Sequence, residues 1–380
     1  MTFAIPYICF FSLLIFISIL TKNKYSSTEI NKTFYSELVI LQYLFIVFSF
    51  VLFLSFRGNV YFDWKSYSRF YDVVPSVFEN NFFAKITTVS KQGWDIGFCF
   101  LGAICKRFSD EYLFFQFINS LLDLFCFFLI FRKYYSRQLF CLCLCFFYCF
   151  AGSYIEVNLL RNSKSIFLFL FSIDYLHDKK WIKFLLLNLI GYLFHGSALI
   201  YIIVAPYLVR KRNNYFIIFF IFIISNFMYL FGINIVSIFL TFIFKFLPSS
   251  LSKLSVFITR YQKDGAYGIT IGYLERCFTF FIFYFFRKDI KSIKNGQLFL
   301  NSFYIYYFSS LILAPLVTVC ERILTLFVYC YWFIYPHVFS KLKTKNQKYF
   351  FIFIFLLYGI LKLYTSNKTE DYIYSNFLFG

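Results

Sequence analysis

Long apolar runs separated by short clusters of Lys and Arg form the dominant pattern of the chain. Runs of roughly 17–25 apolar residues match the length that an α-helix needs to cross a bilayer. The pattern therefore predicts an all-α, polytopic transmembrane helical bundle with about 11–12 spans. The clear runs are residues 3–20, 38–56, 111–131, 139–157, 160–177, 215–240, 270–286, 297–319, 323–340 and 349–364.

Two apolar regions do not fit a single ordinary span. Residues 95–105 are too short to cross comfortably, and residues 183–209 are too long for one span and short for two. Basic clusters flank both ends of the second region, so an even number of crossings must lie between them. Because His195-Gly196-Ser197 nearly halves that region, we expect a hairpin of two short helices that meet there.

Two connections between apolar runs, residues 57–94 and 241–269, are much longer than the others. Loops longer than about 12–15 residues are usually functional or disordered, and these two are too aromatic to be disordered. If the basic short loops are cytoplasmic and residues 95–105 do not cross, both long loops lie outside the cell. We found no internal repeat and no linker, so residues 1–380 are predicted to form a single integral membrane domain.

Composition excludes soluble and nucleic-acid-binding classes. Hydrophobic residues make up 61% of the chain and charged residues only 14%, whereas a soluble domain is about 25% charged. The net charge of +19 is concentrated in short clusters between apolar runs, so we interpret it as a topology signal that also attracts anionic membrane lipids. The 11 Cys match no zinc spacing and the chain has three His, so we expect neither a metal nor a cofactor.

The predicted topology gathers a sparse set of polar residues on the outer face. A charge within a membrane helix costs about 2.5–3.5 kcal/mol, which makes each one a functional candidate. Arginines bind a diphosphate bidentately, and a His or Asp can accept a proton from a hydroxyl. Structural alternatives are that Arg161 snorkels at a helix end, His195 is a packing residue and Asp63 caps a helix. The set is Arg57, Asp63, Asp95, Glu156, Arg161, His195, Arg260, Glu321 and Arg322.

Five short motifs, in this order and on this face, resemble the O-antigen and exopolysaccharide polymerases of the Wzy/EpsG-like group. The resemblance covers roughly residues 40–340, and Asn162 and Lys164 depart from the pattern of the group. The motifs are Arg57-Gly58 followed by Asp63 and Tyr67, Trp94-Asp95-Ile96-Gly97-Phe98, Leu160-Arg161-Asn162-Ser163-Lys164, Phe194-His195-Gly196-Ser197-Ala198-Leu199-Ile200, and Cys320-Glu321-Arg322 followed by Tyr335-Pro336.

The resemblance implies a membrane glycosyltransferase of the bacterial cytoplasmic (inner) membrane. Such a polymerase joins undecaprenyl-diphosphate-linked sugar repeat units at the outer face, in lipopolysaccharide or related polysaccharide biosynthesis. One lipid-linked chain is the donor and another repeat unit the acceptor, and a partner protein regulates chain length.

Each candidate residue has a role in that reaction. We expect His195 or Asp63 to accept the proton of the attacking hydroxyl. Arginines would bind the diphosphate more tightly as its charge develops. The loop aromatics Trp64 and Tyr67 could pack against sugar faces, although anchoring at the membrane interface also explains them. The diphosphate-binding set is Arg161, Arg322, Arg260 and Arg57.

Two other classes use similar residues. A flippase or transporter of lipid-linked sugars would need matched broken helices in two repeats, and the sequence shows only one broken segment. Another membrane glycosyltransferase, such as the ligase that moves finished O-antigen to a lipid core, would differ only in its acceptor.

The predicted hairpin can be tested by reporter fusions. Fusions after Lys183 and after Arg212 should both report a cytoplasmic location, because basic residues flank the break on both sides. Opposite locations for the two fusions would instead require a single crossing between them.

Overall fold

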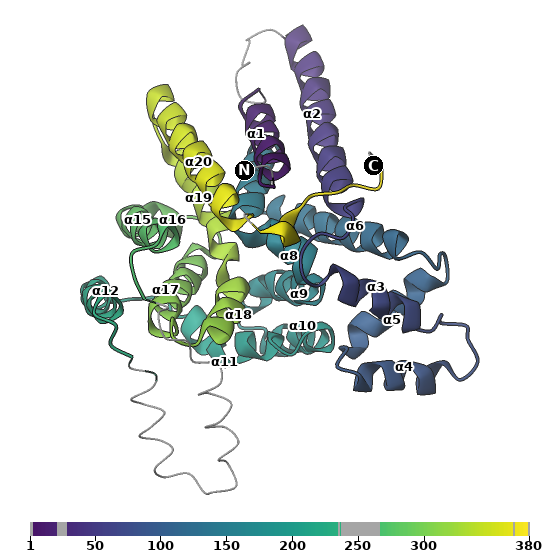
Figure 1. Ribbon diagram of the computed structural model, residues 1–380. Coiled ribbons are helices and arrows are strands. Elements are labelled where there is room, and N and C mark those ends of the chain that lie inside the picture. The colour runs from purple at the N-terminus through teal and green to yellow at the C-terminus, as the bar shows by residue number, and fades with distance from the viewer. Residues whose placement is uncertain (1–2, 21–28, 235, 237–266, 368, 379–380) are drawn as a thin grey trace, which may run out of the picture. The chain divides into compact units, whose positions relative to one another are not determined.

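The computed structural model describes residues 3–20, 29–234, 236, 267–367 and 369–378 (Figure 1). The described residues form helices joined by turns, with one isolated backbone bridge between Arg57 and Asn376 in place of any sheet. The predicted all-α class is therefore confirmed. Close contacts divide the chain into two compact units, residues 1–205 with 335–380 and residues 206–334, whose boundaries fall within two helices. The prediction of a single domain stays a prediction.

The first unit contains the long helices of the N-terminal half and the C-terminal helix. Helix α1 packs against α7 and α20, α2 packs against α6, and α9 packs along α10. A Cβ atom at Gly359 of α20 would overlap the ring of Phe11, so glycine allows α1 and α20 to pack closely. The bounds are α1 Ile5–Leu20, α2 Glu29–Ser55, α6 Tyr112–Phe131, α7 Arg137–Phe147, α8 Ser153–Asn158, α9 Leu160–His177, α10 Trp181–Phe194, α11 Ala198–Leu208 and α20 Lys345–Ser366, with a π-helical turn at Tyr148–Gly152.

The long connection 57–94 folds as a subdomain within the first unit. It carries α3 (Trp64–Val73) and α4 (Phe82–Lys91), which pack with α5 (Ile96–Lys106). The core of this subdomain is aromatic: Phe70 of α3, Phe98 of α5 and Phe115 of α6 are fully buried together. Tyr67, Phe70 and Tyr71 of the connection are thus core residues, whereas Phe62, Phe78 and Phe83 are exposed. The packed core agrees with the prediction that the connection is not disordered.

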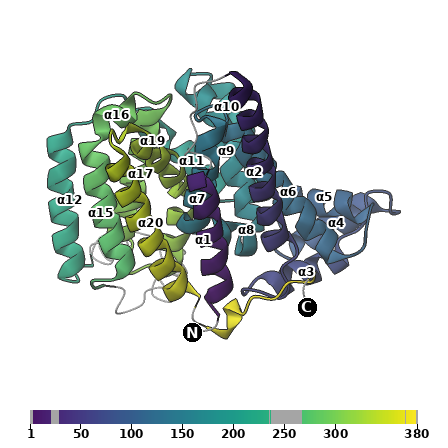
Figure 2. The same ribbon diagram turned by 90° about the horizontal axis from the view of Figure 1, so that it is seen from above.

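The second unit packs α12, α15 and α17 around aromatic rings, and Figure 2 shows these three helices side by side. Phe222 of α12 stacks on Phe280 of α15, with ring centroids 4.1 Å apart. The Asn226 amide donates to Tyr307 Oη over 2.9 Å, and Tyr273 Oη donates to the Asn226 carbonyl oxygen over 2.9 Å. The bounds are α12 Tyr215–Leu230, α15 Ile271–Phe285, α16 Arg287–Lys291, α17 Gly296–Ile312, α18 Val317–Phe327 and α19 Tyr329–Lys341.

Several helices begin at capping residues that the sequence supplies. The Asn214 side chain accepts from the backbone N–H groups of Phe216 and Ile217 in α12, and the Thr270 side chain accepts from that of Tyr273 in α15. Thr344 and Gln347 form a reciprocal capping box at the start of α20. These caps satisfy backbone donors that have no partner within the helix.

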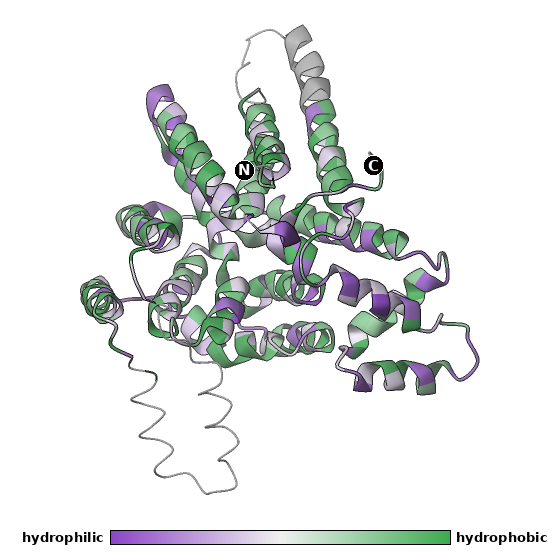
Figure 3. Cartoon of the chain, in the orientation of Figure 1, coloured by the Kyte–Doolittle hydropathy of each residue, from purple (hydrophilic) through white to green (hydrophobic). Residues whose placement is uncertain are grey.

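Apolar residues cover most helices, and hydrophilic residues gather on α3, α4 and the start of α20 (Figure 3). Among the described residues, Tyr112–Phe131, Leu139–Asn158 and Lys345–Ser366 are each long and apolar enough to span a membrane. The bent pair α18 and α19 gives a fourth candidate span, and six further apolar helices are shorter. The total of about 11–12 spans stays a prediction.

The structure confirms a helix break at His195. Helix α10 ends at Phe194 and α11 begins at Ala198, and α10 packs on α9 and α5. The second long connection, residues 241–269, lies almost entirely outside the described residues.

Candidate functional site

A break between α8 and α9 connects the first long loop to the helices. Leu159 lies between the two helices with φ −123° and ψ 46°, outside the helical region. The carbonyl oxygen of Asn158 accepts a hydrogen bond from Tyr67 Oη at 3.3 Å. The side-chain oxygen of Asn158 accepts from the backbone N–H of Asp63 at 3.1 Å. Asp63 and Tyr67, at the start of α3, are therefore held against this break.

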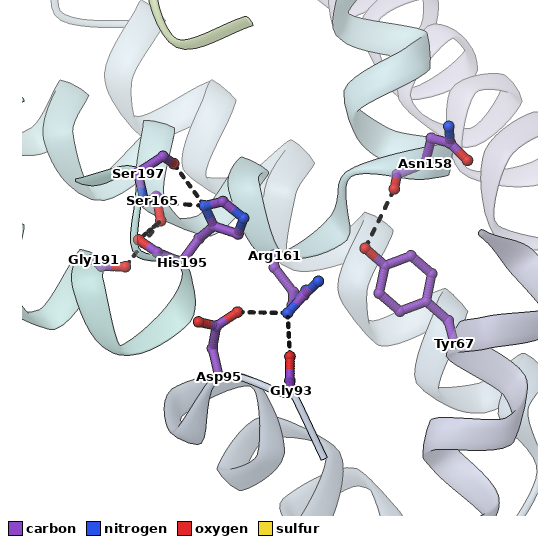
Figure 4. A network of polar contacts seen from close by, with 9 residues as sticks. All are labelled: Tyr67, Gly93, Asp95, Asn158, Arg161, Ser165, Gly191, His195 and Ser197. Atoms are coloured by element: carbon purple, nitrogen blue, oxygen red, sulfur yellow. Dashed lines mark hydrogen bonds and ion pairs between the residues drawn. The ribbon is translucent and has the colours of Figure 1, made fainter. Parts of the chain in front are cut away.

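Arg161 lies in the first turn of α9, two residues beyond the break. Its Nη1 donates to Asp95 Oδ2 at 2.7 Å and to the carbonyl oxygen of Gly93 at 3.2 Å (Figure 4). The guanidinium also lies over the ring of Trp94, 5.0 Å from its centroid. The Arg161 and Asp95 side chains are 26% and 25% exposed. An ion pair that water reaches contributes little, about 0–1 kcal/mol, so a more highly charged anion can replace Asp95.

Two carboxyl groups lie near this guanidinium. Burial raises the pKa of Asp63 and of Asp95 above the ordinary value, and the charge of Arg161 partly opposes the increase. A carboxylate whose pKa is raised accepts a proton more readily than an ordinary one, so Asp63 is suited to act as a base.

His195 ends α10 at the second break. Its Nδ1 accepts from the backbone N–H of Ser197 at 3.2 Å and lies 2.7 Å from Ser197 Oγ. Because a backbone N–H can only donate, this hydrogen bond assigns the neutral ring the tautomer with its proton on Nε2. The neutral imidazole therefore carries its N–H at Nε2, while the lone pair of Nδ1 caps the turn.

Two contacts bring the two breaks together. Ser165, one turn beyond Arg161 on α9, donates from Oγ to the carbonyl oxygens of Gly191 at 2.9 Å and His195 at 3.5 Å (Figure 4). Helix α5 also approaches α10 closely, because a Cβ atom at Gly97 would lie only 2.9 Å from the Leu193 carbonyl oxygen. Asp95, Arg161 and His195 are thereby held at neighbouring helix ends.

The other predicted residues have different surroundings. Arg57 is 1% exposed and donates to the carbonyl oxygens of Leu54, Glu156 and Val157. Its assignment to diphosphate binding stays a prediction, because these hydrogen bonds all go to backbone. Trp64 Nε1 donates to Gln116 Oε1 at 3.0 Å.

The assignment of the remaining two arginines to diphosphate binding stays a prediction. Arg322 is exposed on α18 in the second unit, and Arg260 lies outside the described residues.

Sequence reasoning did not select Asn158 or Ser165. Both are polar residues within or beside apolar runs, where a polar side chain needs a partner. That signal was present, but it does not show which backbone groups the side chains bind.

Long apolar helices, together with arginine, histidine and carboxyl side chains at helix breaks, define a polytopic membrane protein with a polar site. The model of the EpsG family matches residues 40–378, and the chain belongs to this family. The EpsG family comprises polysaccharide polymerase-like membrane proteins, so the resemblance seen in the sequence is confirmed. Comparison with curated proteins and with solved structures gives no match.

The approach of α5 to α10 can be tested at Gly97. Gly97→Ala should lower stability by about 1–3 kcal/mol, because the new methyl group meets the rigid backbone of Leu193. The matched control is Gly196→Ala, where a Cβ atom meets only the ring of Tyr192 at 3.9 Å. Thermal unfolding of the purified protein in detergent measures both variants. Equal melting temperatures for the two would contradict the close approach.

Proposed function

We propose that this protein is a polymerase of undecaprenyl-diphosphate-linked oligosaccharide repeat units. It acts as a glycosyltransferase at the outer face of the bacterial cytoplasmic membrane, in the synthesis of O-antigen or a related surface polysaccharide. Membership of the EpsG family supports a role in polysaccharide synthesis. The observation that carries the mechanism is Arg161, a partly exposed guanidinium at a helix break with a displaceable carboxylate partner.

The reaction transfers the growing sugar chain from one lipid carrier to another repeat unit. A hydroxyl oxygen of the acceptor sugar attacks the anomeric carbon of the donor. The bond between that carbon and the diphosphate oxygen breaks, and the lipid diphosphate leaves with the bonding electrons. The hydroxyl proton goes to a base on the protein. No external reductant, oxidant or nucleotide is required.

Arg161 stabilises the leaving group. Negative charge on the diphosphate increases as the bond breaks, so a guanidinium that binds it more tightly in the transition state lowers the barrier. In the free protein Asp95 occupies Nη1 of Arg161 at 2.7 Å. The diphosphate carries more charge than one carboxylate and takes over this position. Asp95 thus orients the guanidinium before the substrate arrives.

Asp63 and His195 have the two remaining roles, which are proton acceptance and hydrogen-bond donation to the diphosphate. Asp63 is the base, since burial raises the pKa of its carboxyl and it lies within the electrostatic influence of Arg161. His195 donates a hydrogen bond from Nε2 to a diphosphate oxygen, because its Nδ1 is engaged by Ser197. This assignment makes Asp63, of the two bases expected from the sequence, the proton acceptor.

The half-buried Trp64 is the aromatic residue of α3 that we assign to sugar contact. Tyr67 is only 3% exposed, and its hydroxyl group donates a hydrogen bond to the carbonyl oxygen of Asn158. We therefore assign Tyr67 a structural role instead of sugar contact. The assignment of Arg322, Arg260 and Arg57 to diphosphate binding remains a prediction from the sequence, and a chain-length regulator remains an expected partner. Membrane lipids surround the apolar helices.

Charge should matter more than volume at Arg161. Arg161→Ala should abolish polymer longer than one repeat unit while the protein level is kept. Arg161→Lys should be strongly impaired, because an ammonium group cannot reproduce the planar fork of the guanidinium. The measurement is a gel of surface polysaccharide from a deletion strain that carries each variant.

The matched control is Arg69→Ala, which removes an exposed arginine from α3. A normal ladder from Arg161→Ala would remove Arg161 from the site. The deletion strain itself separates the classes: loss of a polymerase leaves single repeat units on the final acceptor, loss of a ligase leaves none, and loss of a flippase blocks export.

Two amide substitutions separate the roles of His195. Asn places an oxygen where Nδ1 lies and keeps the cap, but it has no donor at the position of Nε2. Gln places a donor near Nε2 but cannot keep the cap. We expect His195→Asn to accumulate normally and to lose about 10- to 100-fold in polymerisation rate, the value of one hydrogen bond to a charged group. His195→Gln should retain part of the rate.

Wild-type activity of His195→Asn would show that the imidazole only caps the turn. Complete loss in both variants, with normal protein levels, would make His195 the base in place of Asp63.

A further inference from the structure

A cluster of buried charges lies within the first unit, apart from the residues already assigned. It consists of Asp123 on α6, Lys164 on α9 and Glu156 on α8, which are 1%, 8% and 1% exposed. Asp123 belongs to the candidate span Tyr112–Phe131, and Glu156 to the candidate span Leu139–Asn158. Charged groups at such positions are costly and need partners.

One oxygen of Asp123 is fully engaged. Lys164 Nζ donates to Asp123 Oδ2 at 2.6 Å, and Ser163 Oγ donates to the same oxygen at 2.7 Å. Lys164 also reaches the carbonyl oxygen of Asn119 at 3.5 Å. The ammonium group and the hydroxyl together compensate one carboxylate charge.

The other oxygens of the cluster lack such donors. Asp123 Oδ1 and both carboxyl oxygens of Glu156 receive no hydrogen bond from an N–H or O–H group among the described residues. The Asp123 and Glu156 carboxyl groups lie within hydrogen-bond reach of each other. Two ionised carboxylates at such a distance repel strongly, whereas one proton between them turns the contact into an O–H···O hydrogen bond.

The other titratable groups near the cluster donate no hydrogen bond to Asp123 Oδ1 or to the carboxyl oxygens of Glu156. Arg57 donates to backbone carbonyl oxygens in the last turns of α2 and α8, where the helix dipole favours a cation. The thiols of Cys126 on α6 and Cys105 on α5 also lie within electrostatic range. With one proton on the carboxyl pair, the charges of Lys164, Asp123 and Glu156 sum to zero.

We propose that Asp123 and Glu156 share a single proton and that this pair, joined to Lys164, positions Arg161. Glu156 lies three residues before the break at Leu159, and Lys164 lies three residues after Arg161. The cluster therefore ties α8 and α9 to α6 on both sides of the break. Without the proton the two carboxylates repel, and the junction that holds Asn158 and Arg161 loosens.

The proton has a consequence for stability that does not depend on the proposed function. The folded protein binds this proton, whereas an unfolded chain releases it above the ordinary carboxyl range. Uptake of a proton on folding means that stability decreases as pH rises. Above the ordinary carboxyl range, and for as long as the folded pair keeps its proton, the unfolding equilibrium constant should increase about tenfold per pH unit. The increase should stop once the folded pair has also lost the proton.

The test compares wild type with Glu156→Gln in detergent micelles. The amide keeps the shape of the side chain and permanently supplies an N–H donor to Asp123. We expect wild type to lose stability from neutral to alkaline pH and Glu156→Gln to lose much less. The control Glu111→Gln changes an exposed carboxyl just before α6 and should behave as wild type. An equal pH dependence in wild type and Glu156→Gln would overturn the proposal.

Infrared spectroscopy detects the proton directly. Wild type at neutral pH should show the carbonyl band of a protonated carboxyl group, and the band should disappear at alkaline pH and in Glu156→Gln. Absence of the band from wild type would overturn the proposal even if the variant does not accumulate.

The positioning role rests on the proposed function and has its own measurement. Polymerisation by wild type should fall at alkaline pH with the infrared band, while Glu156→Gln should keep its rate there. Identical pH profiles for the two would remove the positioning role. A protein that shows the band but makes no polymer at any pH would refute the proposed function and leave the shared proton standing.

Discussion

Helix breaks within a membrane protein create backbone N–H and C=O groups that lipid cannot satisfy. The site of this protein is built around that constraint. At the break between α8 and α9, Arg57 binds the last-turn carbonyl oxygens and Tyr67 binds the carbonyl oxygen of Asn158. At the break between α10 and α11, His195 binds the N–H of Ser197. The polar side chains of the motifs are thus needed first to complete the fold.

The need to satisfy the backbone at the helix breaks also determines where the candidate reactive side chains lie. Side chains that satisfy broken backbone are rigidly held, and reactive groups beside them inherit a fixed geometry. Arg161 lies two residues beyond one break, and its guanidinium is held by Asp95 in a pair that water reaches. One turn further along α9, the buried Lys164 pairs with Asp123 at 2.6 Å. The exposed pair can exchange its anion for a substrate, while the buried pair holds the helices that carry it.

Much of this fold could be predicted from hydropathy, because apolar run lengths and basic flanks are local signals. They located α9, the break at His195 and the aromatic connection that carries α3. The partners of Arg161 could not be predicted, because Asp95 lies 66 positions away in sequence and meets it only through the packing of α5. The tautomer of His195 likewise depends on the geometry of a turn. Lys164 was noticed only as a departure from a motif, since its counterion is on another helix.

We propose that this chain alone joins lipid-linked repeat units. The most direct measurement uses purified protein in lipid vesicles, supplied with a single synthetic undecaprenyl-diphosphate-linked repeat unit. We expect chains of increasing length that remain on the lipid diphosphate, with one free lipid diphosphate released for each new glycosidic bond. Movement of the intact lipid across the bilayer without bond formation, or transfer of sugar only to a different acceptor, would contradict it.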